Sequence, residues 1–442
     1  MIAWRFVCVA LTSLVLSSAA MAALPTHDVT LDNGLRLIVR EDSRAPVVTV
    51  MTWVKAGSID EAPHEAGIAH VLEHMLFKNT ERLGPGDFSQ LVARYGGRDN
   101  AFTSYDFTAY FQRYAASRLP LALELEAERF RHLRLDEDEF HREMKVVLEE
   151  RRQRTDDNPG ALAWEKFMAV ARAGTAYANP IIGWGTVLPQ LQPIYAQQWY
   201  ERYYVPGNTT LVIVGDVTLS QVLPLVQQYF GDWPAAPAPV RPQQVLREPM
   251  GERRITVEVP VQVPSLYMSY NVPSKITASD AADFYALTML AGVLDGGRSA
   301  RLPRTLVREQ QLLAGVSARY NGLTRGDGSF TLTATPSAGV SLEQAEAALM
   351  EQLQQIHSKP PTAQELARVR ANVLASDVYK QDSNMGQAME LGMLAVLGLD
   401  LQMPERLSKQ LEAVTAEDIQ RAAKRWLVKQ RLAVAHVVQE SQ

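Results

Sequence analysis

The residues best suited to chemistry lie together in one short segment, residues 64–80 (HEAGIAHVLEHMLFKNT). His70 and His74 are four residues apart, so both imidazoles project from one side of a helix, and Glu73 immediately precedes His74. Two neutral imidazoles at this spacing can each give a nitrogen to one zinc ion at about 2.0–2.1 Å. The neighbouring carboxylate can accept a proton from a water molecule at the metal. The order His-x-x-Glu-His, called the inverzincin motif, therefore predicts a hydrolytic metal site.

The apolar residues around this motif predict the helix that positions it. From Ile68 to Leu76 they recur at i, i+3, i+4, i+7 and i+8, the spacing of one buried helix face. The histidines lie beside this apolar stripe. The alternative is a solvated helix that carries two surface histidines and no metal.

A catalytic zinc site takes three protein ligands, and the best candidate for the third lies in residues 136–155. Apolar residues at Phe140, Met144, Val147 and Leu148 predict a second helix there. Glu143 and Glu150 are two turns apart and share one edge of this helix. From spacing alone, a helix so rich in charge is more often a solvated surface, so the residues by themselves leave the role of Glu150 open.

A basic run on the same segment has a simpler interpretation. We expect its side chains to be solvated charges paired with neighbouring glutamates; they are Lys145, Arg151, Arg152 and Arg154. The other six histidines are scattered, and each is expected to be a surface or packing residue.

A proline-rich stretch, residues 233–244, divides the chain of 442 residues and is typical of a semi-rigid linker. The flanking halves, residues 23–232 and 245–442, show the same order of patterns. Each begins with strand-like alternation, continues with helical patterns and closes with a helix that leads into a strand, at residues 197–214 and 420–438. This repetition predicts a duplicated α+β domain, with the two copies facing each other across the linker.

The first 22 residues are predicted to be a cleaved signal peptide. Arg5 supplies the positive charge, residues 6–16 are almost entirely apolar, and Ala20-Met21-Ala22 offers a cleavage site. The alternative is an uncleaved membrane anchor. Cys8, the only cysteine of the chain, lies in this segment, so the mature chain would have neither a disulfide nor a cysteine nucleophile. Export, most simply to a bacterial periplasm, fits this pattern.

The charge balance and the motifs exclude other classes of partner. Lys and Arg number 44 and Asp and Glu 49, a net charge of −5, whereas a nucleic-acid-binding protein would need a basic face. No glycine-rich phosphate loop with a following Lys-Ser/Thr occurs, so we expect no dependence on ATP.

Several segments, in the same order, resemble the pitrilysin family of zinc peptidases, which includes insulin-degrading enzymes and mitochondrial processing peptidases. They are residues 67–80, 96–106, 143–150, 180–183 and 204–208. This resemblance implies that His70, His74 and Glu150 bind zinc and that Glu73 is the general base. It implies that Glu143 supports the site from outside the ligand set, and that a strand with Asn100, Ala101 and Phe102 pairs with the peptide backbone of the substrate. The alternative for this strand is a plain sheet edge without a ligand.

The second half departs from the family pattern. Residues 294–302 resemble its glycine-containing stretch, and Arg308 corresponds to the arginine of a substrate-binding Arg/Tyr pair set seven apart. Seven residues later this chain has Gly315, and Tyr320 is out of register. In short-chain members a metal-bearing subunit can pair with a homologue that carries the pair. The substitution therefore predicts a heterodimer with a homologous, metal-free subunit that carries the Arg/Tyr pair. The alternative is a monomer or homodimer that tolerates the glycine.

Together, the sequence and the resemblance predict a clamshell of two homologous α/β-sandwich domains. We expect an exported endopeptidase with one zinc ion per chain, acting on peptides or unfolded segments in extended form. The alternative is a structural or binding subunit of a larger complex, because relatives of this fold serve in a respiratory complex without peptidase activity. The intact set of His70, Glu73, His74 and Glu150 argues against it.

Overall fold

The computed structural model describes residues 24–246 and 248–440 of the chain. The predicted signal peptide, residues 1–22, lies outside the described residues. Within the described part, none of the helices combines the length and the apolar character that a membrane-spanning segment requires.

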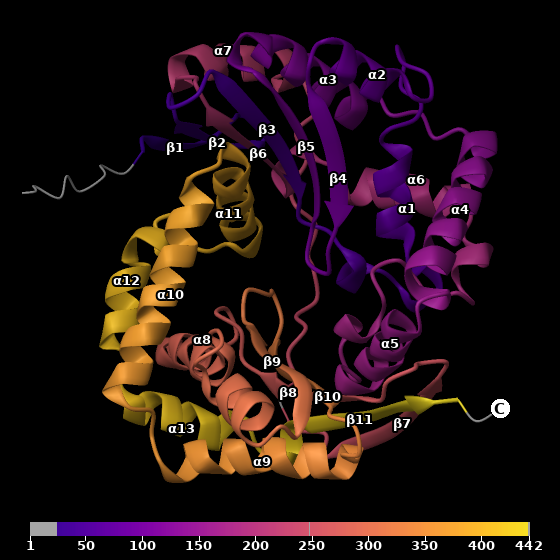
Figure 1. Ribbon diagram of the computed structural model, residues 1–442. Helices are drawn as coiled ribbons and strands as arrows, with labels where there is room; N and C mark the ends of the chain where they lie inside the picture. Colours follow the sequence, from indigo (N-terminus) through magenta and orange to yellow (C-terminus); the bar gives the residue numbers. More distant parts are fainter. Residues whose placement is uncertain (1–23, 247, 441–442) are drawn as a thin grey trace, which may run out of the picture.

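Two mixed sheets repeat one topology, as the matching halves of the sequence predict (Figure 1). The first has six strands in the order β1-β2-β6-β3-β5-β4 and the second has five in the order β7-β11-β8-β10-β9. In each sheet one parallel pair, β2–β6 or β7–β11, is followed by antiparallel neighbours only. The edge strand β4 of the first sheet thus corresponds to the edge strand β9 of the second. The α+β class and the duplicated sandwich are confirmed.

The elements of the first half are β1 (Thr26–Thr30), β2 (Arg36–Glu41), β3 (Val47–Val54), α1 (Ile68–Met75), α2 (Asp87–Arg94), β4 (Arg98–Thr103), β5 (Thr108–Ala115), α3 (Leu119–Arg131), α4 (Glu137–Arg151), the π-helix η4 (Arg152–Asp156), α5 (Pro159–Ala171), α6 (Pro193–Tyr203), β6 (Thr209–Gly215) and α7 (Leu219–Phe230). Those of the second half are β7 (Arg253–Val259), β8 (Ser265–Val272), α8 (Ala281–Asp295), the π-helix η8 (Pro303–Glu309), β9 (Leu313–Asn321), β10 (Gly328–Pro336), α9 (Leu342–Ser358), α10 (Ala363–Gln381), α11 (Asn384–Leu397), α12 (Met403–Ala413), α13 (Ala416–Trp426) and β11 (Leu432–Gln439).

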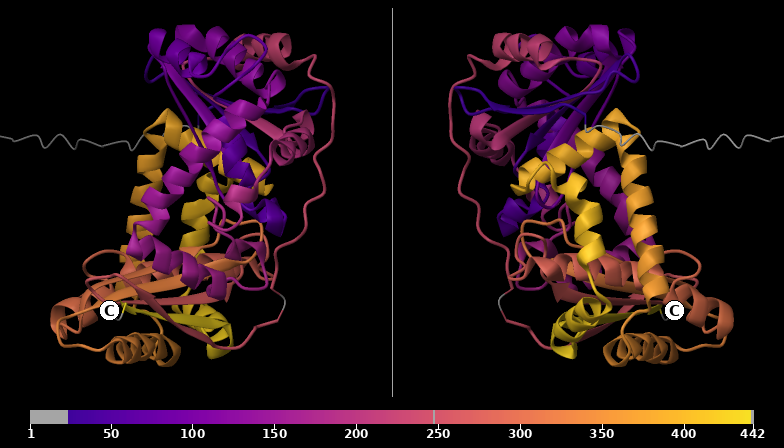
Figure 2. Two further views of the ribbon diagram at one scale, coloured as in Figure 1. Left: turned by 90° about the vertical axis from the view of Figure 1, so that its right-hand side faces the viewer. Right: turned by 90° about the vertical axis from the view of Figure 1, so that its left-hand side faces the viewer.

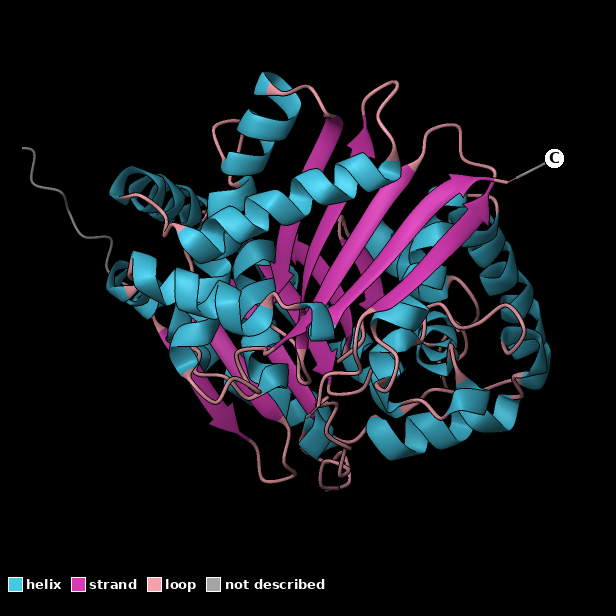
Figure 3. Cartoon of the chain, turned by 90° about the horizontal axis from the view of Figure 1, so that it is seen from below, coloured by secondary structure: helices cyan, strands magenta, loops and turns pink. Residues whose placement is uncertain are grey.

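Strands β3 and β6, at the centre of the first sheet, are buried on both faces along almost their whole length, which explains why they are largely apolar. In β2, Leu37 and Val39 point into the core of the first half, while Ile38 between them points to the opposite face. In the second sheet, residues of β8 pack under α8, α9 and α13, and the other face of β11 and β7 meets α5. Figure 3 shows this second sheet with helices around it.

The two halves exchange helices. Helix α5 of the first half packs on β7 and β11 of the second sheet, and α11 of the second half packs on β3 and β6 of the first. The two helices lie on opposite sides of the molecule, so each half reaches across to cover the other (Figure 1). Trp53 of β3 lies so close to Gly392 of α11 that an added Cβ would stand 1.9 Å from its ring.

Polar contacts join the halves beside α5. Arg325 Nη2 lies 2.7 Å from Asp60 Oδ1, and the backbone N–H of Gly326 donates to the hydroxyl of Tyr177 over 2.9 Å. Between α7 and β7 the described residues form no helix or strand, and the chain runs along one side of the molecule from the first half to the second (Figure 2). This segment contains the proline-rich stretch.

Candidate metal centre and peptide groove

The motif helix α1 begins at a fixed point. Gly67 precedes it with φ of 104°, in the left-handed region that glycine adopts without strain. The carboxylate of the buried Glu61 accepts hydrogen bonds from the backbone N–H groups of Gly67 and Ala69, over 2.8 and 2.9 Å. A carboxylate at a helix N-terminus satisfies amide groups that have no partner within the helix. Gly67 and Glu61 therefore fix the N-terminus of α1, and with it the orientation of the helix that carries both histidines.

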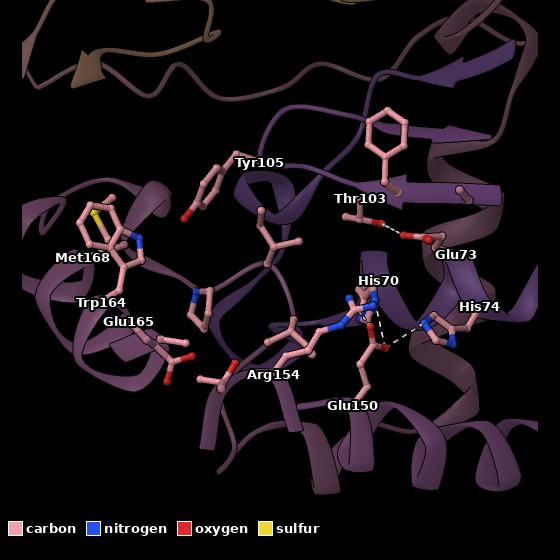
Figure 4. Close-up of a pocket in the computed structure, with 18 of the residues that line it drawn as sticks. His70, Glu73, His74, Thr103, Tyr105, Glu150, Arg154, Trp164, Glu165 and Met168 are labelled. Atoms are coloured by element: carbon pink, nitrogen blue, oxygen red, sulfur yellow. Dashed lines mark hydrogen bonds and ion pairs between the residues drawn. The ribbon is translucent and has the colours of Figure 1, made fainter. Parts of the chain in front are cut away.

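Helix α4 packs beside α1 and brings the third side chain to the histidines. Oε2 of Glu150 lies 3.7 Å from Nε2 of His70 and 3.3 Å from Nε2 of His74. One ligand atom from each of these three residues lies within 4.8 Å of the others, and no other such group occurs among the described residues. The three donor atoms face one point (Figure 4).

Glu143 fixes the orientation of the His74 ring through the nitrogen that does not face the other candidate ligands. Its Nδ1 lies 2.8 Å from Oε1 of Glu143, and Nζ of Lys78 lies 2.6 Å from Oε2 of the same carboxylate. A ligating histidine commonly donates its second N–H to a carboxylate, which leaves Nε2 available for the metal. Glu143 therefore contacts His74, and the supporting role in a metal site that the resemblance implies for it stays a prediction. Lys78, one turn beyond His74, was not singled out by sequence reasoning.

Glu73 lies beside the three candidate ligands but is held by a different element. The hydroxyl of Thr103, at the end of β4, donates to Glu73 Oε2 over 2.6 Å. Burial raises the pKa of Glu73, and the hydrogen bond from Thr103 opposes part of this shift. A buried carboxylate with a raised pKa is a stronger base than an exposed one, which suits a group that must accept a proton.

The donor set fits a metal ion. Burial, followed by the neighbouring His74, lowers the pKa of His70 to about 4, so its imidazole is neutral at pH 7. Burial also acts to lower the pKa of His74, but its contacts with Glu143 and Glu150 outweigh this and raise the value to about 9. The contact with His74 lowers the pKa of Glu150. Two imidazoles and one carboxylate are a set found in catalytic zinc sites.

The three candidate ligands open into a cavity of about 570 Å³. Its lining includes Asn100, Ala101, Phe102 and Thr103 of β4 on one side and Arg154, Trp164 and Met168 on another. A second cavity of about 520 Å³ shares Glu73, His74 and Asn100 with the first and continues toward Lys78, Asp99 and Glu143. Among the described strands β4 is the last of its sheet, so its outer edge can pair with an extended chain. The two cavities together make a groove along this edge.

The second half contributes less to this groove. Arg308 is exposed at the end of η8 and is not among the residues that line the 570 Å³ cavity beside the candidate metal ligands. Gly315 lies in the edge strand β9, opposite Thr335. The hydroxyl of Tyr320 donates to the carbonyl of Pro273 over 2.7 Å, so this side chain has a structural contact of its own. The substrate role of Arg308 stays a prediction.

One sequence interpretation is wrong: the basic run is not uniformly solvated. Arg151 is buried, and its guanidinium binds both carboxylate oxygens of Glu165 over 2.9 and 2.8 Å and the carbonyl of Gly183 over 2.7 Å. The partner lies on the next helix, beyond the reach of i,i+4 reasoning. Thr103 was missed for the same reason, because Glu73 is 30 residues away in the sequence and is brought close only by the fold. Glu61 is only six and eight residues from its partners Gly67 and Ala69, but it precedes the segment in which the motif was recognised.

Comparisons with known proteins agree with the fold. The family described as "Insulinase (Peptidase family M16)" matches residues 36–185, and "Peptidase M16 inactive domain" matches residues 195–373. The chain is 31% identical to the zinc protease PqqE of Helicobacter pylori over 381 residues, 85% of each chain. The crystal structure of a protease from Helicobacter pylori superposes with a TM-score of 0.88 at 27% identity, covering 94% of this chain and 99% of that one. The periplasmic protease PqqL of Escherichia coli has a TM-score of 0.79 at 22% identity, covering 94% and 48%.

Proposed function

Because the chain belongs to the M16, or insulinase, family of peptidases, we propose that it is a zinc-dependent endopeptidase that hydrolyses peptides or unfolded segments bound in extended form. The observation that carries this proposal is the convergence of His70, His74 and Glu150 on one point, within 4.8 Å of one another. Glu73 lies beside that point, in a groove bordered by the edge strand β4.

The three side chains would hold zinc through Nε2 of each histidine and Oε2 of Glu150. When bound, the ion supplies Lewis acidity, which polarises the scissile carbonyl and makes water a stronger nucleophile. Glu73 accepts the proton from the attacking water and passes it to the leaving amine. The hydroxyl of Thr103 holds Glu73 in place during both transfers through its hydrogen bond to Oε2. The other carboxylate oxygen, Oε1, then carries the proton.

Strand β4 would position the substrate. Within the segment Asn100–Phe102, the backbone N–H and C=O groups of alternate residues point to the free edge and would pair with an extended peptide that runs past the metal ligands. The N–H of Ala101 donates to the side-chain Oδ1 of Asn100 over 2.9 Å, a bond that a peptide would replace. The side chain of Phe102 packs edge-on against Trp53 and Phe107. This packing anchors the strand in its sheet while its outer edge stays open.

A homologous partner chain is the second part of the proposal. Gly315 stands where the resemblance places a substrate-binding tyrosine, and Tyr320 is engaged with Pro273. A second chain that carries the Arg/Tyr pair would supply this missing contact. Introducing the side chain by Gly315→Tyr should then raise the activity of the lone chain, and full activity of the unaltered lone chain would contradict the need for a partner. Gly315 has room for the change, since no atom lies within 4 Å of an added Cβ.

Export to the periplasm is also proposed, on the basis of the signal-like residues 1–22. A C-terminal fusion to alkaline phosphatase, which is active only after export, tests it. Activity that persists after residues 1–22 are deleted would contradict this part of the proposal and leave the peptidase proposal intact.

Peptide cleavage decides between the peptidase and the structural subunit. The mature chain, residues 23–442, is loaded with zinc and incubated with a mixture of unstructured peptides, alone and with a candidate partner chain. Mass spectrometry should detect internal cleavage that stops on addition of a chelator. Zinc-loaded protein that cleaves nothing in either form would favour the structural subunit.

A further inference from the structure

The cavity beside the candidate metal ligands contains one arginine, Arg154, whose only acidic partner among the described residues is the candidate ligand Glu150. Outside the candidate ligands and Glu73, the charged residues that line it are Arg154 and Glu165. Glu165 is paired through both oxygens with the buried Arg151. The charge that remains for a bound molecule on this side of the cavity is therefore that of Arg154.

The π-helix η4 places Arg154 there. Arg152, in the same turn, points outward to Glu149 and Asp157, whereas Arg154 turns back and pairs with Oε1 of Glu150. In Figure 4 the Arg154 side chain lies between the candidate ligands and the wall formed by Trp164 and Glu165. Its side chain is 72% exposed, so the guanidinium is accessible from the groove.

The pair with Glu150 leaves the guanidinium of Arg154 able to bind a second carboxylate. Its other oxygen, Oε2, faces both histidines, so its negative charge would be shared between Arg154 and a divalent ion. A guanidinium has five N–H donors in a planar fork and binds carboxylates through two of them. One contact with Oε1 leaves donors that face the cavity.

We propose that Arg154 recognises a carboxylate of the substrate, so that the enzyme prefers peptides with an Asp or Glu side chain close to the scissile bond. This inference rests on the proposed peptidase function and adds the substrate class. The carboxylate lies on the Arg154 side of the metal, whereas the opposite end of the groove carries Asp99 and Glu143. Glu143 there is already paired with Lys78, so a peptide with its acidic residue in the reverse position would meet the carboxylate of Asp99.

The test compares amidated peptides that differ only by Glu, Gln or Lys at each position around one cleavage site. The unaltered chain should cleave the Glu peptide with a kcat/KM about tenfold above that of the Gln peptide at one position. Arg154→Ala should abolish this preference, and Arg154→Glu should transfer it to the Lys peptide. Arg152→Ala, which removes a neighbouring arginine that faces outward, should leave it unchanged. A Gln peptide with a free C-terminal carboxylate shows whether the main-chain carboxylate can substitute for the side chain.

Equal cleavage of Glu and Gln peptides at every position, or a preference that survives in Arg154→Ala, would overturn the inference. So would an equal loss for all peptides with a loss of zinc, which would mean that Arg154 acts only through Glu150. Binding of the same peptides to the zinc-loaded Glu73→Gln variant, followed by fluorescence anisotropy, gives a readout without turnover. If no peptide is cleaved, the peptidase proposal fails, while the ratio of Glu to Gln binding still decides the role of Arg154.

Discussion

The hydroxyl of Thr103 donates to Oε2 of Glu73 over 2.6 Å, although the two residues belong to different elements. Thr103 ends the edge strand β4, and Glu73 lies on the helix that carries both histidines. The contact thus joins the proposed substrate-pairing strand to the proposed base. Any displacement of β4 would also displace the carboxylate.

Removal of this hydroxyl tests its role. Thr103→Val keeps the shape of the side chain but removes the hydroxyl that donates to Glu73, and we expect kcat to fall about tenfold because the base is less well oriented. KM and zinc content should change little, and Thr103→Ser should restore most of the activity. A loss that is equal in the Val and Ser variants would show that the hydroxyl is not what matters.

Glu73 should be needed for turnover and not for zinc. Glu73→Gln preserves size and the contact with Thr103 but cannot accept a proton, so we expect kcat to fall by about 10²–10⁴-fold. Elemental analysis should find as much zinc in the variant as in the unaltered chain. Retention of substantial activity by the zinc-loaded variant would contradict the assignment of the base.

Zinc binding should release a proton from His74. The pKa of His74 is raised to about 9 in the metal-free protein, so the imidazole is protonated at pH 7 and must lose this proton to coordinate. His70, with a pKa lowered to about 4, has none to lose. Apparent zinc affinity should therefore rise by about tenfold per pH unit between pH 7 and pH 9. Calorimetry at pH 7 in two buffers of different ionisation enthalpy measures the release, and the absence of a buffer effect would contradict it.

The contact between α11 and the first sheet should be intolerant of added volume. Gly392→Ala would place a Cβ 1.9 Å from the ring of Trp53, so either the halves separate or the core repacks, at about 1–3 kcal/mol. Thermal unfolding should show a lower midpoint for this variant. Gly315→Ala, which meets nothing within 4 Å, is the matched control and should leave the midpoint unchanged. Equal midpoints for the two variants would mean that α11 does not pack as described.

The sequence predicts a helix or strand well where the spacing of its apolar residues matches the helix or strand period. The apolar stripe from Ile68 to Leu76 predicts α1, and the helix-to-strand patterns that close each half correspond to α6–β6 and α13–β11. These signals are short-range and depend on which side chains share one face. The repetition of the patterns is also enough to predict the duplicated topology.

Contacts between distant segments were not predictable in the same way. Glu150 faces His74 because α4 packs beside α1. Its spacing from Glu143 made it a candidate, but spacing could not show that it reaches the histidines while Glu149 is exposed and pairs with Arg152. Only the resemblance to a known family selected Glu150. The pairing of Arg151 with Glu165 and the exchange of α5 and α11 between the halves likewise depend on tertiary packing.

The central claim is that His70, His74 and Glu150 form one zinc site, and metal content tests it most directly. The mature chain, its Glu150→Gln variant and its Glu149→Gln variant are loaded with zinc, dialysed and analysed for metal. We predict one zinc ion per chain in the unaltered protein and in Glu149→Gln, and a strong loss in Glu150→Gln, because Glu150, unlike Glu149, faces Nε2 of both histidines. No zinc in the unaltered chain, or an undiminished content in Glu150→Gln, would contradict the account.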